Sequence, residues 1–383
     1  MHQKQRIYFD NAASSPPLPS LIENYIRLTN KNYANPNASH SAGLECLKLI
    51  RKSEQQILNI LCRKSSEKTN ILWTASATEA ANIAIMGFCS QLDSGEILTT
   101  PIEHKAISNT LEHINPNLKI RTIPLNDNIT INTEKLREIL SDSTKLIAIH
   151  HVNNELGIIQ NLEEIDKLRQ EHAPDAKLLA DTTQSCGKID IPWDSAHIDM
   201  MIASSHKFHG IHGTGSLIFR KDLKLNPLIH GGYQQLGIHS GTLNVPGIAA
   251  YAETIEIMNQ NIQTNLKKIR EINKYLRENL KSRFKKKVVF HSSANISSPY
   301  ILSFALKGYQ GAVIMRALGN KNIIIGTGSA CASETRTPNT IITATTISKE
   351  LAYSTLRLSL GQQNTLQEAE IFLRTLEHIL ENY

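Results

Sequence analysis

The segment SSHKFHG, residues 204–210, places a lysine between two histidines directly after the apolar run IDMMIA. A lysine at the end of a buried strand is partly removed from water, which lowers its pKa and makes the free amine reactive toward an aldehyde. Lys207 is therefore a candidate for covalent attachment of a carbonyl cofactor. Most lysines extend into solvent, so the motif by itself leaves that alternative open.

Three histidines follow one another at three-residue spacing, His206, His209 and His212, and they suggest a metal site. However, Gly210 and Gly213 make a continuous helix through them doubtful. No cysteine or carboxylate lies close by in the sequence to complete a zinc set, and a lysine among the ligands would repel the metal. We therefore expect no metal here.

Asp181, in DTTQS (181–185), directly follows a fully apolar stretch. A buried carboxylate needs a cationic partner, and a protonated pyridine nitrogen would serve. The competing explanation is that Asp181 caps a helix.

A second candidate segment is TASATEAAN (74–82), where small residues and a threonine open a helix. The free N–H groups of a helix N-terminus suit a phosphate, and the Thr78 hydroxyl is an added donor. Simple helix capping explains Thr78 equally well. No GxGxxG or GxxxxGK[ST] pattern is present, which argues against dinucleotide and P-loop binding.

Two residues of the C-terminal third complete the set. Cys331 lies among tiny residues in GTGSACASET (326–335), as is typical of an accessible, mobile thiol, although small buried cysteines are common. Arg357 is the one arginine of TLRLSLG (355–361), and it could hold a carboxylate or form a surface salt bridge. A phosphate site, an aspartate, a reactive lysine, a carboxylate-binding arginine and a thiol together match pyridoxal phosphate with an amino acid substrate.

The elements that must position these residues are short apolar runs separated by helical patterns. Runs without polar alternation predict an α/β fold, with a mostly parallel sheet covered by helices on both faces. The expected strands are residues 70–74, 96–100, 145–151, 176–180, 198–204 and 215–219. Ligands of such sheets bind where strands end and helices begin. The segments expected at the site are residues 75–79, 103–104, 153–155, 181–184 and 204–207.

The pattern changes at Pro246, after which the chain is helical to about Phe284. An unbroken helix of that length would reach about 55 Å, so we expect it to bridge two domains. A strand at 300–306 and helices near 310–319 and 366–381 follow. The predicted large, cofactor-binding domain covers residues 16–255. The predicted smaller α+β domain covers residues 1–15 and 256–383, and it carries the Cys331 loop at about 326–348.

Composition narrows the class of protein. The 383 residues are 40% hydrophobic and carry a mild net charge of +6, and the basic run at 281–287 has no alternating aromatics. We therefore expect no direct nucleic-acid partner. Five cysteines, an odd number without a CxxC, indicate a reducing compartment. The absence of an apolar N-terminal segment and of an 18-residue apolar run predicts a soluble, cytoplasmic protein without membrane contact.

Ten short motifs occur in an order and at a spacing that resemble one family over nearly the whole chain. They are YFDNAASSPP, NPNASH, ATEAANIAI, EHKA, HVNNELG, DTTQS, SSHKFHG, SGTLNV, GSACAS and LRLSLG. The chain resembles cysteine desulfurases of the NifS/IscS type, in the class V aminotransferase group of fold-type I pyridoxal phosphate enzymes. The long segment between Cys331 and Arg357 is similar to the subgroup with a long catalytic loop.

The resemblance implies that L-cysteine is converted to L-alanine and that its sulfur becomes a persulfide on Cys331. A homodimer is implied, as is an acceptor such as an iron–sulfur scaffold protein or a carrier for tRNA thiolation. The implied catalytic residues are Cys331, Lys207 and His104. The implied cofactor-binding residues are Ala77, Thr78, His104, Asn154, Asp181, Gln184, Ser204, His206, Lys207 and, from the second subunit, Thr242. The implied ligands of the substrate carboxylate are Asn35 and Arg357.

Within the implied site, Asp181 would pair with the ring nitrogen, Gln184 would face the ring oxygen, and His104 would stack on the ring and move protons. Several positions depart from the family pattern. Leu236 and His239 replace arginines, and His209 replaces a tyrosine. Ala75 and Ser76 replace a Ser-Gly pair. The departures predict a working enzyme that is slow or depends on a partner. The alternatives are a selenocysteine lyase, a class V aminotransferase or a low-activity accessory homologue.

Overall fold

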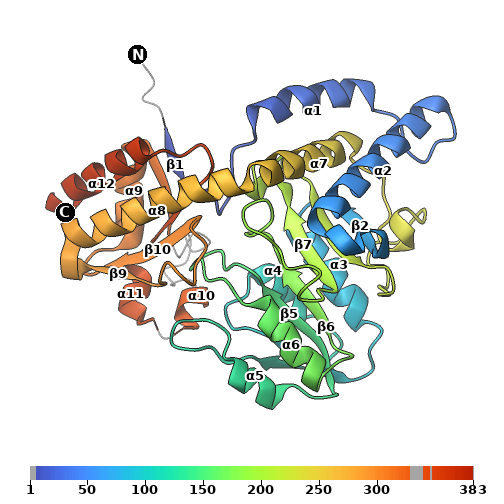
Figure 1. The fold of residues 1–383 in the computed structure, drawn as a ribbon, viewed down its shortest axis with the longest axis horizontal. Coiled ribbons are helices and arrows are strands. Elements are labelled where there is room, and N and C mark those ends of the chain that lie inside the picture. Colours follow the sequence, from blue (N-terminus) through green and yellow to red (C-terminus); the bar gives the residue numbers. More distant parts are fainter. Residues whose placement is uncertain (1–5, 328–339, 346, 383) are drawn as a thin grey trace.

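The computed structural model describes residues 6–327, 340–345 and 347–382, and within them two β-sheets are joined by long helices (Figure 1). The larger sheet has the strand order β2-β8-β7-β6-β5-β3-β4. Its strands are β2 (Thr69–Thr74), β3 (Gly95–Thr99), β4 (Leu118–Thr122), β5 (Thr144–His150), β6 (Lys177–Asp181), β7 (Met200–Ser204) and β8 (Gly215–Arg220). Neighbours from β4 to β7 are parallel, and β8 is antiparallel to both β7 and β2. The predicted mostly parallel sheet is confirmed.

The strand that the sequence did not predict is β4, at the edge of this sheet. Its residues, LKIRT, are mostly exposed, and only Leu118 is buried. An edge strand is half solvated and carries polar residues, so it lacks the continuous apolar run that marks the buried strands.

Helices cover both faces of the large sheet. They are α1 (Pro19–Lys31), α2 (Ser41–Leu61), α3 (Ala77–Cys89), α4 (Lys105–Leu111), α5 (Thr133–Ile139), α6 (Leu162–His172) and α7 (Val245–Gln260), with short 3₁₀ turns η1 (Arg63–Lys68), η2 (Ser205–Lys207) and η3 (Gln235–Gly237). Alternate residues of β5 enter two separate cores. Ile147 and Ile149 pack with α2, α6 and α7, whereas Leu146 and Ala148 pack with α3 and α4. Both faces are therefore apolar, which explains why the strands show no polar alternation.

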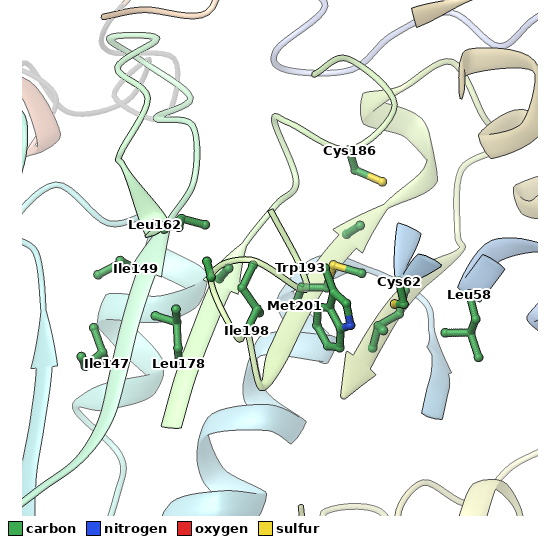
Figure 2. Close-up of a cluster of buried hydrophobic side chains, with 14 of the residues drawn as sticks. Leu58, Cys62, Ile147, Ile149, Leu162, Leu178, Cys186, Trp193, Ile198 and Met201 are labelled. Carbon is green, nitrogen blue, oxygen red and sulfur yellow. The ribbon is translucent and has the colours of Figure 1, made fainter. Parts of the chain in front are cut away.

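Figure 2 shows part of the first of these cores, where Trp193 and Met201 lie between Ile198 and Cys62. Cys62 and Cys186 both belong to it as free thiols. Cys46 and Cys89 are likewise free and buried. These four cysteines are therefore ordinary core residues.

The smaller sheet has the order β1-β11-β12-β10-β9. Its strands are β1 (Ile7–Phe9), β9 (Val288–Phe290), β10 (Ile301–Leu306), β11 (Ile323–Thr327) and β12 (Thr355–Ser359). The accompanying helices are α8 (Ile262–Phe284), α9 (Gly311–Gly319), α10 (Thr340–Thr343), α11 (Lys349–Tyr353) and α12 (Leu366–Glu381), with the turn η4 (Lys285–Lys287). The N-terminal strand β1 pairs in parallel with β11, so the start of the chain belongs to the C-terminal sheet.

The long helical stretch spans both cores, but it is two helices. It breaks at Asn261, which ends α7 and precedes α8. Figure 1 shows α7 and α8 end to end. Ile255 of α7 lies in the core of the large sheet, and Ile269 of α8 lies in the core of the small sheet. The predicted domain boundary between residues 255 and 256 remains a proposal. The move from the core of the large sheet at Ile255 to the core of the small sheet at Ile269 supports it. Among the described residues, every helix is too short or too polar to cross a membrane.

Helix α12 packs in the core of the small sheet and begins with a reciprocal cap. Thr365 Oγ1 accepts from the Glu368 N–H at 3.1 Å, and Glu368 Oε2 accepts from the Thr365 N–H at 2.9 Å. We predict that Thr365→Ala lowers the free energy of unfolding by about 1 kcal/mol, because an N-terminal N–H loses its acceptor. Chemical denaturation measures the loss. Thr365→Ser keeps the oxygen and should remain close to wild type; equal losses in both variants would contradict the capping role.

Candidate active site

Lys207 lies in η2, one turn beyond β7, where its side chain folds back toward the N-terminal segment. Its Nζ donates to the carbonyl oxygens of Ala12 at 2.9 Å and Ala13 at 2.8 Å. Burial and the neighbouring Arg357 lower the pKa of Lys207 to about 8, against the opposing attraction of Asp181. About a tenth of such an amine is unprotonated at pH 7, far more than for a lysine of ordinary pKa, and the unprotonated form is the nucleophile.

Asp181 ends β6 and is 8% exposed. Its Oδ1 accepts from the Thr183 N–H at 2.9 Å, but no lysine, arginine or histidine of the described chain forms an ion pair with it. Ser204, at the end of the adjacent strand β7, is also buried. A buried carboxylate without a counter-cation is costly, so this position suits a cationic ligand atom.

The N-terminus of α3 lies at the end of β2 and opens toward solvent. Ser76 Oγ accepts a hydrogen bond from the Glu79 N–H. The N–H groups of Ala77 and Thr78 have no acceptor among the described residues. Gly215 of β8 passes so close that a Cβ there would stand 2.6 Å from the Ser76 carbonyl carbon. Free N–H groups at a helix end are a ready site for a phosphate.

His104 is the N-cap of α4, with its Nδ1 accepting from the Ala106 N–H at 3.1 Å. Removal of the imidazole from water lowers the pKa of His104, while Asp181 acts to raise it and Lys207 to lower it. The electrostatic coupling places these three predicted residues in one site. At neutral pH His104 is thus mainly unprotonated and able to accept a proton.

Arg357 of β12 is 3% exposed and lies between two carboxylates. Its Nη2 is 2.8 Å from Asp10 Oδ1, and its Nη1 is 3.0 Å from Glu155 Oε1. Nη1 also donates to the Asn154 carbonyl oxygen at 3.0 Å, which brings the predicted residue Asn154 to this group. Burial alone would lower the pKa of Arg357, but Glu155 and Asp10 outweigh it and raise the pKa.

The three closely spaced histidines do not all point toward one place that could hold a metal ion. His206 Nδ1 and His212 Nε2 both contact Ser14 Oγ, at 3.2 and 2.8 Å, whereas His209 Nδ1 bonds to the Pro16 carbonyl oxygen. Burial lowers the pKa values of His206 and His209 to about 4, so both are neutral near pH 7. In the described part of the chain, no group of three His, Cys, Asp or Glu side chains is placed to hold a metal.

Several predicted site residues do not contact Lys207, Asp181, His104 or Arg357 in the described structure. Asn35 is exposed in the α1–α2 loop, where its Oδ1 accepts from the Asn37 N–H. Thr242 is exposed between η3 and α7. Cys331 lies outside the described residues. Gln184 is close to the site, since its Nε2 donates to the same Ala12 carbonyl that accepts from Lys207.

Sequence reasoning assigned no role to Asp10 or Glu155, although both lie in motifs that it singled out. Glu155 even belongs to a segment expected at the sheet edge. The signal that could have found them is the charge of Arg357, because a buried guanidinium requires carboxylate partners. Nothing in their spacing along the chain, however, indicates which carboxylates those are.

The family model of the class-V aminotransferases matches residues 7–372. This chain belongs to the class-V aminotransferase family. Enzymes of this family use pyridoxal phosphate. Among curated relatives, a NifS/IcsS protein homolog of Lactobacillus delbrueckii subsp. bulgaricus is 32% identical over 98% of both chains. The cysteine desulfurase IscS of Dictyoglomus turgidum is 29% identical, over 99% of this chain and 95% of its own.

A solved structure described as a NifS-like protein superposes on this class-V aminotransferase with a TM-score of 0.91 and 28% sequence identity. The match covers 99% of this chain and 100% of the other. The fold-type I assignment is therefore confirmed.

The lowered pKa of Lys207 makes a direct prediction for this class-V aminotransferase. An amine with a pKa of about 8 is protonated below that pH and free above it, so its reactivity should rise through pH 8. We expect reductive trapping of pyridoxal phosphate on the cofactor-free protein to label Lys207 with a midpoint near pH 8. Peptide mass spectrometry after borohydride treatment measures it. Exposed Lys274 is the internal control, and a Lys207 midpoint above pH 10 would contradict the prediction.

Gly326 of β11 leaves the room that the Arg357 guanidinium occupies. A Cβ at this position would stand 2.8 Å from both Arg357 Nη2 and Asp10 Oδ1. We predict that Gly326→Ala displaces the ion pair, raises KM for the substrate, and lowers the free energy of unfolding by about 1–3 kcal/mol.

Gly319→Ala is the matched control for this prediction, because a Cβ there meets nothing within 4 Å. Its free energy of unfolding should stay within about 0.5 kcal/mol of wild type. Equal behaviour of the two variants in denaturation and steady-state kinetics would contradict the proposed close packing.

Proposed function

We propose that this chain is a pyridoxal-phosphate-dependent cysteine desulfurase that converts L-cysteine to L-alanine and passes the sulfur to an acceptor. The observation that carries the proposal is that Lys207, a lysine of lowered pKa, lies near Asp181, a buried carboxylate that forms no salt bridge with any described residue. The similarity to a cysteine desulfurase over 99% of the chain supports the choice of cysteine as the substrate.

The residues of the site fit pyridoxal phosphate. Among the described residues, the N–H groups of Ala77 and Thr78 have no acceptor and suit its phosphate, and the carboxylate of Asp181 forms no salt bridge and suits its protonated ring nitrogen. When bound, the cofactor supplies an electron sink for the carbon that loses a proton. The further holding residues that we propose are His104, Asn154, Gln184, Ser204, His206, Lys207 and, from a second subunit, Thr242.

The chain's own groups divide the remaining work. Arg357, together with Asn35, is proposed to bind the substrate carboxylate, since a guanidinium offers several donors in one plane. Lys207 Nζ, unprotonated in part near pH 8, is proposed to take up the proton of the substrate's α-carbon. His104 is proposed to hold and return protons, because its lowered pKa keeps the imidazole neutral.

Sulfur transfer is assigned to Cys331. Its thiolate attacks the sulfur of the substrate, so that an S–S bond forms as the C–S bond breaks. The electron pair of the C–S bond stays on the carbon, which takes up a proton and becomes the methyl group of alanine. Cys331 is left as a persulfide, whose outer sulfur the acceptor then removes. No external oxidant is needed.

We further propose a cytoplasmic homodimer that gives its sulfur to an iron–sulfur scaffold protein or a tRNA-thiolation carrier. Large apolar side chains support a second copy, since they stand exposed beside Thr242 in the same connection: Tyr233 is 88% and Leu236 66% exposed. Ile22 and Ile26 of α1 are also exposed. Apolar surface of this kind is typical of an interface.

The role of Cys331 is tested by Cys331→Ala. We expect alanine formation from cysteine in the presence of a reductant to fall by about a hundredfold or more, since the sulfur loses its acceptor thiol. Cys89→Ala, the same change at a buried free cysteine, is the control. Wild-type rates in Cys331→Ala would favour a selenocysteine lyase or an aminotransferase. No alanine or sulfide from the wild type, even with a scaffold protein present, would favour an accessory homologue.

A further inference from the structure

Lys188 is a buried lysine that the mechanism above does not use. It lies in the turn after β6 and is 3% exposed. Its Nζ donates to Gln184 Oε1 at 3.1 Å, and within residues 6–327, 340–345 and 347–382 no carboxylate forms an ion pair with it. Burial and, after it, the nearby cations Lys207 and Arg357 together lower the pKa of Lys188 to about 7.

A buried lysine without a carboxylate is a poor means of stabilising a fold, because the desolvation of its amine is not offset by an ion pair. An apolar residue of similar length would fill the same space at lower cost. The position of the amine must therefore be explained by what it touches, and the group that it touches is the amide of Gln184.

The two neighbours of that amide fix its orientation. On one side lies the amine of Lys188, which donates; on the other lies the Ala12 carbonyl oxygen, which can only accept. The amide must therefore turn Oε1 to Lys188 and Nε2 to Ala12, where the Nε2–O distance is 2.9 Å. The flipped orientation would set Oε1 against the Ala12 carbonyl oxygen, which are both acceptors, and an amide N–H against the protonated Lys188 amine, which are both donors.

The Nε2 side of the amide is the side that faces the site. The Ala12 carbonyl oxygen accepts from Gln184 Nε2 and also from Lys207 Nζ, at 2.9 Å in each case. Lys188, Gln184 and Lys207 therefore form one hydrogen-bonded chain through the Ala12 carbonyl oxygen. This series of hydrogen bonds begins at the buried Lys188 amine and ends at the reactive amine of Lys207.

We propose that Lys188 is a positioning residue that holds the Gln184 amide with its N–H groups directed into the site. The inference rests on the proposed function, in which Gln184 donates to the ring oxygen of pyridoxal phosphate. A fixed donor favours the deprotonated form of that oxygen and so sets the pH at which the bound cofactor changes its absorption. Lys188 itself does not touch the cofactor.

The test is a pH titration of the visible absorption of the holoenzyme. We expect Lys188→Met to raise the midpoint by about one pH unit, a tenfold change in proton affinity, because the amide is no longer held as a donor. Gln184→Leu should raise it by a similar amount. Lys274→Met, the loss of a 76% exposed lysine side chain, should leave the midpoint unchanged.

The double variant separates positioning from a direct effect of charge. Loss of a nearby cation would also raise the midpoint, and that effect would persist when Gln184 is already leucine. If Lys188 acts through Gln184, Lys188→Met causes no further shift of the titration midpoint in a protein that already carries Gln184→Leu. Additive shifts overturn the inference, as does an unchanged midpoint in Lys188→Met.

Two further outcomes are distinguishable. Should Lys188→Met not fold, Lys188→Leu, which also removes the N–H donor, takes its place in the same cycle. A wild-type protein that shows no visible band after incubation with pyridoxal phosphate overturns the proposed function, and this inference with it. A wild-type band combined with additive shifts overturns the inference alone.

Discussion

The buried guanidinium of Arg357 is the constraint on which the arrangement of the site depends. Arg357 belongs to the small sheet, and its two carboxylates come from the N-terminal segment, Asp10, and from the large sheet's β5–α6 connection, Glu155. Removing one partner from a buried ion pair typically costs about 3–5 kcal/mol. The Arg357 guanidinium therefore holds the two sheets together at the point where the substrate is proposed to bind.

The N-terminal segment 10–16 extends this constraint to the reactive lysine. Its Ala12 N–H donates to Ser359 Oγ of the small sheet, while its Ala12 carbonyl oxygen accepts from Lys207 beyond the large sheet. Ser15 Oγ donates to the His206 carbonyl oxygen. A short stretch of backbone thus connects the arginine side of the site with the lysine side. Burial is the main cause of the lowered pKa of Lys207, and the proximity of Arg357 lowers this pKa as well.

The sequence predicted those parts of the site that depend on local pattern. Asp181 is the last residue of β6 and Lys207 lies three residues beyond β7, so the sheet rule located both without knowledge of the packing. The pairing of β1 with β11, in contrast, joins Ile7 to Ile323 through strands of three and five residues. No local signal specifies such a contact. Nor could the pattern identify the carboxylates of Arg357, because their proximity arises only when the two sheets pack together.

Leu236 and His239, at which the sequence resemblance leads us to expect arginines, have different surroundings in the structure. His239 keeps a polar role, since its Nε2 lies 2.8 Å from Glu79 Oε1 while Glu79 Oε2 accepts from the Ala75 N–H. The first turn of α3, where the phosphate is proposed to bind, therefore retains a side chain that orients it. Leu236 is exposed, with a positive φ of 61°, and it adds apolar surface instead of charge. An apolar side chain at position 236 changes what this surface can bind, whereas the His239–Glu79 contact still supports the first turn of α3.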